Sequence, residues 1–325
     1  MPATSYPASS SEFQNQRATP ESVVILLCTF NGARFLPLQL ASFEAQTISD
    51  WRLFASDDGS EDNTMALLTE FQRKHGHRRV QIRRGQRQGF VANFLSLLCD
   101  PTVTSDYYAF SDQDDIWGNA KLARALSYLK QSSSLLPVIY CSRTRLIDDS
   151  GVEIGLSPLF RKKPHFRNAL VQSIAGGNTM VFNEKARSVL MKAGPDVNVP
   201  SHDWWAYLAT TAVGGMICYD PTPTVDYRVH ANNAVGSNRS FGDIMRRAQM
   251  VWKGRFRTWN DQNIQSLDRI RDLMLEENNS VLEVFSRSRD FALVPRLCGL
   301  VRSGVYRQTL LGNIGMLLAA LVGKL

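Results

Sequence analysis

The sequence predicts an α/β fold with a mostly parallel central sheet flanked by helices. Residues 23–29 form a continuous apolar run, which suits a central strand that is buried on both faces. Apolar strands and helical patterns alternate at short intervals up to residue 131, which indicates parallel strands joined by right-handed crossovers. Three of the strands end in polar clusters, and the ends of parallel strands lie along one edge of a sheet.

In the first half of the chain, apolar residues recur at strand or helical spacing between polar turns. Residues 62–64 can cap one of the helices, and Gly89 precedes another. We expect, in order, a strand at residues 23–29, a helix from residue 35, a strand at residues 51–56, a helix from residue 64, a strand at residues 80–83, a helix from residue 90, a strand at residues 107–110 and a helix at residues 119–131.

The second half contains shorter elements. Ser201 or Asp203 can cap a helix there, so the sequence alone leaves two roles open for Asp203, a plain N-cap and a chemical group. We expect a strand at residues 138–141, a surface loop at residues 161–165, a Gly-Gly-Asn turn that leads into a strand ending at residue 182, a helix from residue 201 and a strand at residues 224–230.

The densest chemical signal follows the strand at residues 107–110. Asp112, Asp114 and Asp115 stand close together there, and the next cation is Lys121. Carboxylates this close repel one another unless a cation lies among them, and hard oxygen ligands suit Mg²⁺ or Mn²⁺. A solvated acidic turn is the alternative. Polar clusters also end two other strands of the predicted sheet, at residues 30–32 and 57–59, which favours a ligand site because independent turns have no reason to share one edge.

Composition narrows the choice of partner. The net charge is +7, and residues 238–325 contain 14 Lys and Arg against 8 Asp and Glu, which suggests an anionic partner for that part. No nucleic-acid motif occurs, and neither GxGxxG nor GxxxxGK[S/T] follows the first strand. Five dispersed cysteines without zinc spacing indicate buried, reduced thiols in a cytosolic protein.

Five motifs in a fixed order identify a family. They are Cys-Thr-Phe-Asn-Gly at residues 28–32, Asp-Asp-Gly-Ser at 57–60, Ser-Asp-Gln-Asp-Asp-Ile-Trp at 111–117, His-Asp-Trp-Trp at 202–205 and Tyr-Arg-x-His-x-Asn-Asn at 227–233. This combination resembles glycosyltransferase family 2, the inverting family with the Rossmann-like GT-A fold, and in particular the bacterial rhamnosyltransferases that build O-antigen and other surface polysaccharides. The resemblance implies a GT-A domain at residues 21–238, between a flexible tail at 1–20 and a basic helical region at 239–325.

The resemblance also implies a role for each matching residue. Asp203 falls at the position of the catalytic base, and Asp114 and His230 at positions that reach the metal. The tryptophans beside Asp203 additionally predict a sugar-stacking platform. The implied donor-binding residues are Cys28, Phe30, Asn31, Asp58, Asn93, Asp112 and Gln113, and the acceptor side is expected at Trp117, Asn178, Trp204 and Trp205.

These roles imply transfer of one sugar from a nucleoside-diphosphate sugar, dTDP-rhamnose or a UDP-hexose, to a lipid-linked or saccharide acceptor. A Mg²⁺ or Mn²⁺ ion stabilises the leaving diphosphate, and one carboxylate deprotonates the acceptor on the opposite face of the sugar, so the anomeric centre is inverted. The base must therefore come from outside the acidic turn. The processive signature Gln-x-x-Arg-Trp is absent, and Arg87 stands where the family has asparagine.

Two other functions remain open, a nucleotidyltransferase and a non-catalytic basic module that binds a membrane. Apolar residues from Leu310 to Val322 recur at helical spacing, in a run shorter than the ~20 residues a membrane span needs. This pattern predicts either a peripheral helix on the inner face of the cell membrane, or a helix packed on the protein's own core or in a homodimer interface. We expect a cytoplasmic enzyme at that membrane surface, with no nucleic-acid partner.

Overall fold

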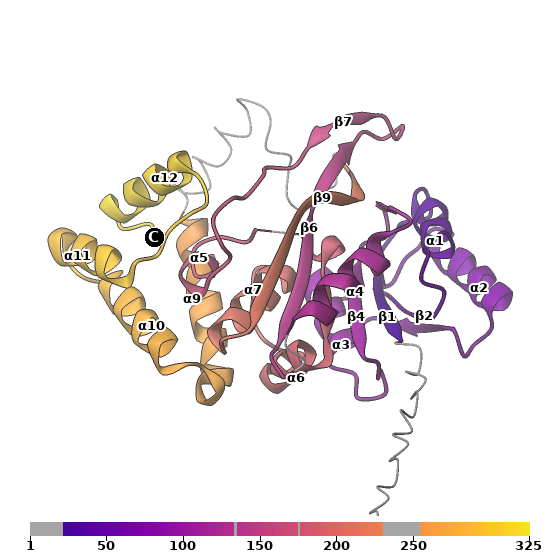
Figure 1. Ribbon diagram of the computed structural model, residues 1–325, viewed down its shortest axis with the longest axis horizontal. Coiled ribbons are helices and arrows are strands. Elements are labelled where there is room, and N and C mark those ends of the chain that lie inside the picture. Colours follow the sequence, from indigo (N-terminus) through magenta and orange to yellow (C-terminus); the bar gives the residue numbers. More distant parts are fainter. Residues whose placement is uncertain (1–21, 133–134, 175, 230–253) are drawn as a thin grey trace, which may run out of the picture.

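The computed structural model describes residues 22–132, 135–174, 176–229 and 254–325. Figure 1 shows a curled central sheet with helices on its two faces, and a group of C-terminal helices at one end of the molecule. The predicted tail at residues 1–20 and the predicted boundary at residue 238 lie outside the described residues, as does His230.

The first half of the chain follows the predicted order, with one short strand, β5, that the sequence did not suggest. Its elements are β1 (Val23–Thr29), α1 (Leu36–Glu44), β2 (Trp51–Asp57), α2 (Thr64–His75), β3 (Val80–Arg84), α3 (Phe90–Leu98), β4 (Tyr107–Ser111), β5 (Ile116–Trp117) and α4 (Lys121–Gln131).

The second half adds the strands that complete the sheet and the helices that extend beyond it. Its elements are β6 (Val138–Ile147), β7 (Glu153–Leu156), α5 (Phe166–Ala169), η1 (Gly177–Thr179), β8 (Val181–Asn183), α6 (Glu184–Ala193), α7 (His202–Ala212), β9 (Met216–Arg228), α9 (Arg255–Leu267), η2 (Asp268–Leu273), α10 (Glu276–Ser288), α11 (Leu293–Ser303) and α12 (Leu310–Leu321).

The sheet has the strand order β3-β2-β1-β4-β8-β6-β9-β5, with β7 paired to β6. Strands β3, β2, β1 and β4 pair in parallel, as do β6 and β9. The short strand β8 joins these two groups because it runs antiparallel to both β4 and β6. The predicted α/β class with a mostly parallel sheet is therefore confirmed, with antiparallel pairs at β8 and near the edges.

Strand β1 is the centre of the core, as its apolar run predicts. Val24 and Leu26 face a cluster that includes α3, α6 and α7, whereas Ile25 and Leu27 face a cluster that includes α1 and α4. All four side chains are fully buried. Helices on both faces thus fix β1, and with it the position of the residues that follow its end.

Strand β9 begins eight residues before the predicted start at residue 224. Pro221 and Pro223, a residue type that is rare inside strands, lie in the part of β9 before the predicted start. The structure accommodates them in an irregular stretch, because the register with β6 shifts between Ser142 and Thr144. Proline is tolerated where ladder hydrogen bonds are already interrupted.

Helices α9 to α12 share a hydrophobic core with the rest of the chain. Leu267, Phe285 and Ala319 belong to the same buried cluster as residues of α6 and α7. Within the described residues, no helix is both long enough and apolar enough to cross a bilayer. The expected burial of all five thiols was wrong for Cys298, which is exposed on α11.

Candidate active site

The ends of β1 and β4 meet through an amide pair. Gln113 Nε2 donates to the carbonyl oxygen of Phe30 at 2.9 Å, and its Oε1 accepts from the Phe30 N–H at 2.8 Å. Gly32 provides the space, since a Cβ there would lie 2.1 Å from Gln113 Oε1. The ring of Phe30 is 55% exposed, so it offers an open aromatic face at this edge.

The end of β2 joins the same edge. The N–H of Asp58 donates to the carbonyl oxygen of Thr29 at 2.8 Å. Asn31, at φ 48°, donates its N–H to Ser60 Oγ at 2.8 Å, and its side-chain oxygen accepts from the N–H of Glu61 at 2.9 Å. The predicted convergence of the three polar strand ends is therefore confirmed.

Two residues that were predicted to contact the donor, Asp58 and Asn93, make hydrogen bonds within the protein. The carboxylate of Asp58 accepts from the N–H groups of Arg87 and Gly89, at 2.7 and 2.8 Å, and so orders the loop before α3. Asn93 is buried, and its amide bonds both the side chain and the carbonyl of Ser56. Asn93 therefore holds α3 against β2, which corrects the expected direct contact with the donor. The donor-binding role of Asp58 stays a prediction.

The acidic turn after β4 is partly buried. Asp115 is fully buried and accepts from Asn178 Nδ2 at 2.5 Å and from the N–H of Arg228 at 3.3 Å. Burial, followed by the charge of Asp114, raises the pKa of Asp115 to about 7. The turn also carries Asp112, whose pKa burial and the neighbouring carboxylates raise well above its usual range.

A buried lysine supports this turn from behind. Lys121 is 1% exposed, and its Nζ donates to the carbonyl oxygen of Asn178 at 2.8 Å. Its ammonium group lies 3.1 Å from the ring centroid of Trp117. Burial lowers the pKa of Lys121, while the charges of Asp115 and Asp112 oppose that shift. That Lys121 lies near the acidic turn could be expected from the sequence, because it is the first cation after that turn.

Arg228 closes the other side of the turn. Its Nε donates to the carbonyl oxygen of Asp114 at 3.1 Å, and its Nη1 donates to the carbonyl oxygens of Asp148 and Asp149. The guanidinium group lies over the ring of Phe35, 4.5 Å from the centroid. Arg228 belongs to the motif at residues 227–233, from which no role for it was expected. The structure makes it the link between β9 and the acidic turn.

Asp203 lies in the first turn of α7, separate from the acidic turn. The N-cap position belongs to Ser201, whose side chain makes no capping bond. The carboxylate of Asp203 accepts from the N–H of Gly177 at 3.2 Å and from that of Trp204 at 2.7 Å. Its charge adds to the raised pKa of Asp112, after burial and the charges of Asp115 and Asp114.

The three-residue helix η1 connects both groups of carboxylates. The N–H of Gly177 bonds Asp203, and the side chain of Asn178 bonds Asp115. Asn178 is 3% exposed and also receives Lys121 at its carbonyl oxygen. A single backbone segment thus sets the spacing between the acidic turn and Asp203. Asn178 was expected on the acceptor side, and the structure gives it this positioning contact.

The predicted stacking platform was wrong in this structure. Trp117, Trp204 and Trp205 are 2%, 6% and 0% exposed, so none presents a ring face to a ligand. Trp204 donates its Nε1–H to the carbonyl oxygen of Ala169 at 2.7 Å. Trp204 and Trp205 belong to α7, which is buried on most of its circumference, whereas Trp117 lies in β5 and packs against Phe43.

Sequence analysis assigned no role to His202. Its ring stacks on Phe94 at 3.9 Å between centroids and lies edge-on to Phe110 at 4.8 Å. Within the described part of the chain, neither ring nitrogen has a hydrogen-bond partner. Burial lowers the pKa of His202 to about 4, against the opposing charge of Asp203. His202 is therefore a neutral ring that packs the start of α7 against α3 and β4.

The described residues contain no group of three or more His, Cys, Asp or Glu side chains arranged to hold a metal ion. Burial raises the pKa of Asp112 above its usual range, and repulsion from the neighbouring carboxylates, which a cation would relieve, adds to that shift. Mg²⁺ in particular keeps several waters and is commonly held by one or two carboxylates together with substrate phosphates. The acidic turn therefore fits a cation that the donor diphosphate helps to bind, with His230 lying outside the described residues.

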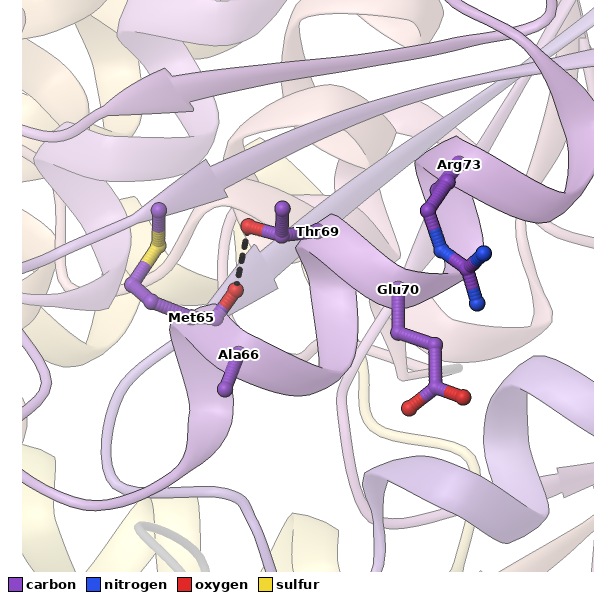
Figure 2. A pocket seen from close by; sticks show the side chains of 5 residues that line it. All are labelled: Met65, Ala66, Thr69, Glu70 and Arg73. Atoms are coloured by element: carbon purple, nitrogen blue, oxygen red, sulfur yellow. Dashed lines mark hydrogen bonds between the residues drawn. The ribbon is translucent and has the colours of Figure 1, made fainter.

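A hollow elsewhere on the surface is not part of this site. Figure 2 shows it along α2, where it has a volume of about 510 Å³ and is lined by Met65, Ala66, Thr69, Glu70 and Arg73. Thr69 Oγ1 donates to the carbonyl oxygen of Met65 within the helix. The lining comes from one helix and includes none of the polar strand ends, so we do not assign it to the chemistry.

Comparison with known proteins gives the family. The model of Glycosyl transferase family 2 matches residues 24–190, just over half of the chain. The chain belongs to glycosyl transferase family 2. This family 2 chain is 28% identical to dTDP-rhamnosyl transferase RfbG of Shigella flexneri over 239 residues, which cover 69% of this chain and 78% of that protein. It is 31% identical over 121 residues to an uncharacterized glycosyltransferase of Nostoc sp., covering 36% and 35% of the two chains.

Solved structures establish the fold of this family 2 enzyme. Staphylococcus aureus TarS, in complex with UDP-GlcNAc, is similar with a TM-score of 0.53 and 12% identity, over 88% of this chain and 93% of that chain. GalNAc-T7 with UDP, GalNAc and Mn²⁺ is similar with a TM-score of 0.52 and 9% identity, over 88% and 55%. The predicted GT-A fold and glycosyltransferase class are thereby confirmed.

Proposed function

We propose that this enzyme transfers a single sugar, with inversion, from a nucleoside-diphosphate sugar to a lipid-linked or saccharide acceptor in the synthesis of a bacterial surface polysaccharide. The similarity to a dTDP-rhamnosyl transferase makes dTDP-rhamnose the first donor to test, before UDP-hexoses. One observation carries the mechanism. Asp203 accepts from the N–H of Gly177, and the side chain of the next residue, Asn178, donates to Asp115, so η1 holds Asp203 beside the acidic turn but outside it.

The strand ends supply the donor side of this proposal. The exposed ring of Phe30 suits stacking on a nucleotide base, and the Gln113 amide fixes its backbone. Asn31 stands beside it at the tight turn after β1. Cys28, two residues before Phe30, is buried, and burial raises the pKa of its thiol. The thiol therefore acts as an apolar side chain at the base of the proposed nucleotide site.

The acidic turn is the proposed metal side. When bound, a Mg²⁺ or Mn²⁺ ion held by Asp114 with Asp112, and by His230 as the family resemblance implies, would supply the positive charge that the leaving diphosphate needs. A structural relative was solved with UDP and Mn²⁺, which supports a divalent cation here. Asp115 supports the turn from behind, since Asn178 and the backbone of Arg228 occupy its oxygens.

Asp203 is the proposed general base. Hydrogen bonds from the N–H groups of Gly177 and Trp204 orient its carboxylate. A carboxylate separate from the metal side can take the proton of an acceptor hydroxyl that attacks the opposite face of the sugar. One displacement of this kind inverts the anomeric carbon, whereas retention by double displacement requires a nucleophile on the attacked face.

The test measures release of nucleoside diphosphate from a panel of nucleotide-sugars by the full-length protein, with acceptor saccharide and Mn²⁺ present. Asp203→Asn should lower the turnover number about 10²- to 10⁴-fold while donor binding persists. Asp114→Asn should weaken donor binding that depends on Mn²⁺. Glu70→Gln, at an exposed position on α2, is the control and should behave as wild type.

The same assay separates the alternatives. Release of pyrophosphate in place of nucleoside diphosphate would identify a nucleotidyltransferase. Full activity of Asp203→Asn would exclude Asp203 as the base, and full activity in the presence of a chelator would exclude the metal. The anomeric configuration of the product, measured by NMR, would overturn the single displacement if it were retained.

A further inference from the structure

The outer faces of α11 and α12 form an exposed apolar surface. Figure 1 places these helices together at the end of the molecule away from α1 and α2. Of the 23 large hydrophobic side chains that are exposed among the described residues, 11 belong to residues 291–325. We name them the C-terminal apolar surface: Phe291, Leu293, Val294, Val301, Leu310, Leu311, Ile314, Leu317, Leu318, Leu321 and Val322.

The side of helix α12 that faces the protein packs against its hydrophobic core. Met316, Ala319 and Ala320 are buried against the protein, whereas Leu311 is 80% exposed and Leu318 is 57% exposed. The helix is therefore apolar on both sides, and packing on the protein's own core accounts for only one of them. Exposed apolar side chains gathered along one face of a helix in this way mark an interaction surface.

The charges around this surface have one sign. After Asp290 the chain contains no acidic residue, but it contains four cations, Arg296, Arg302, Arg307 and Lys324. Arg302 is exposed at the end of α11 and forms no ion pair within the described ranges. The surface thus combines exposed aliphatic side chains with the exposed guanidinium group of Arg302.

This charge pattern discriminates between two occupants. A two-fold dimer places the same patch against itself, so its cations would face residues 291–325 of the partner, which contain no Asp or Glu to compensate them. An anionic bilayer complements both properties, since its headgroups attract the cations and its acyl boundary accepts the aliphatic side chains. The observations therefore favour lipid over a second copy of the chain.

We propose that the C-terminal apolar surface docks on an anionic lipid bilayer, with α11 and α12 lying in the plane of its interface. The evidence for this docking is the C-terminal apolar surface itself and does not depend on the proposed function. Its consequence for substrate, that the acceptor is presented on a lipid carrier at the same bilayer, rests on the proposed function. Leu311 and Leu318 enter the acyl boundary, and Arg302 meets the headgroups.

Flotation of the full-length protein with lipid vesicles tests this proposal. Wild type should float with vesicles of phosphatidylglycerol and phosphatidylcholine and not with pure phosphatidylcholine, and raised salt should weaken the binding. The double variant Leu311→Ser/Leu318→Ser should bind at least about tenfold more weakly, because two inserted leucines are lost. Arg302→Gln should reduce binding to the anionic vesicles and, like wild type, should not float with pure phosphatidylcholine.

Matched control variants replace the same residue types at exposed positions outside the C-terminal apolar surface. Leu135→Ser deletes a leucine that is also 80% exposed, and Arg78→Gln deletes an exposed cation near α2; both should float as wild type does. Nucleotide-sugar turnover with a water-soluble acceptor should be unchanged in every variant, so loss of docking and failure of the proposed function are separate results. Equal flotation of wild type and the double leucine variant would overturn the proposal. So would a concentration-dependent dimer that the double variant dissociates, without vesicle binding by wild type.

Discussion

Replacement of His202 by leucine should remove a large part of the protein's sensitivity to mild acid. The imidazole is enclosed by Phe94 and Phe110, and neither of its nitrogens has a hydrogen-bond partner within the described residues. Leucine therefore deletes no hydrogen bond. What it removes is a group that must stay neutral in the folded protein, because burial lowers the pKa of His202 to about 4.

The sign follows from comparing the two states. An unfolded histidine has a pKa of about 6.5, so between pH 6.5 and pH 4 the unfolded chain binds a proton that the folded protein excludes. Stability consequently falls as the pH drops through this range. A difference of about 2.5 pKa units corresponds to roughly 3 kcal/mol in total, and about 2 kcal/mol of it is lost by pH 5.

Urea unfolding of wild type and His202→Leu at pH 7.5 and pH 5 measures this effect. Between the two pH values, the variant should lose about 2 kcal/mol less stability than wild type. Any packing cost of leucine is the same at both pH values and cancels in the comparison. His77→Leu, at an exposed position in the turn after α2, is the control and should track wild type. Equal pH dependence of wild type and His202→Leu would refute the assignment of a buried neutral ring.

Three further substitutions test the architecture of the site and its support. Gly32→Ala should break the amide pair between Gln113 and the end of β1, and weaken nucleotide binding about tenfold in a calorimetric titration, with little change in fold by circular dichroism. Asn178→Ala should cost about 2 kcal/mol in urea unfolding, because it leaves the buried carboxylate of Asp115 without its side-chain donor; an unchanged midpoint would contradict this. Thr309→Ala should cost about 1 kcal/mol, since its hydroxyl caps α12 by accepting from the backbone N–H three residues on.

The sequence was sufficient to predict the features that depend on local pattern. The apolar run of β1 and the alternation that follows it identify the sheet, and the shared edge of parallel strands brings Phe30, Asp58 and Gln113 together. Strand β8 could be anticipated as a strand, but not its position between β4 and β6. Three residues carry too little pattern to specify two antiparallel partners.

The errors concern side chains whose surroundings come from distant parts of the chain. Asn93 and Trp205 have residue types that suit ligand contact, and only the packing of α3 and α7 shows that both are buried. The same limit applies to Lys121 and His202. Their proximity in sequence to the acidic turn and to Asp203 was visible, whereas their burial depends on the long-range contacts of helices α4 and α7 with the sheet.

The turn at η1 has a consequence for how this enzyme could acquire new substrates. Gly177 bonds Asp203 and the adjacent Asn178 bonds Asp115, so one piece of backbone sets the gap between Asp203 and the acidic turn. Under the proposed function, this gap does not depend on which nucleotide base or sugar the ends of β1 and β2 accept. Donor preference can therefore drift at the ends of β1 and β2 without loss of catalytic alignment. Conversely, a defect introduced in η1 should lower turnover at saturating donor, and a higher concentration of donor should not restore it.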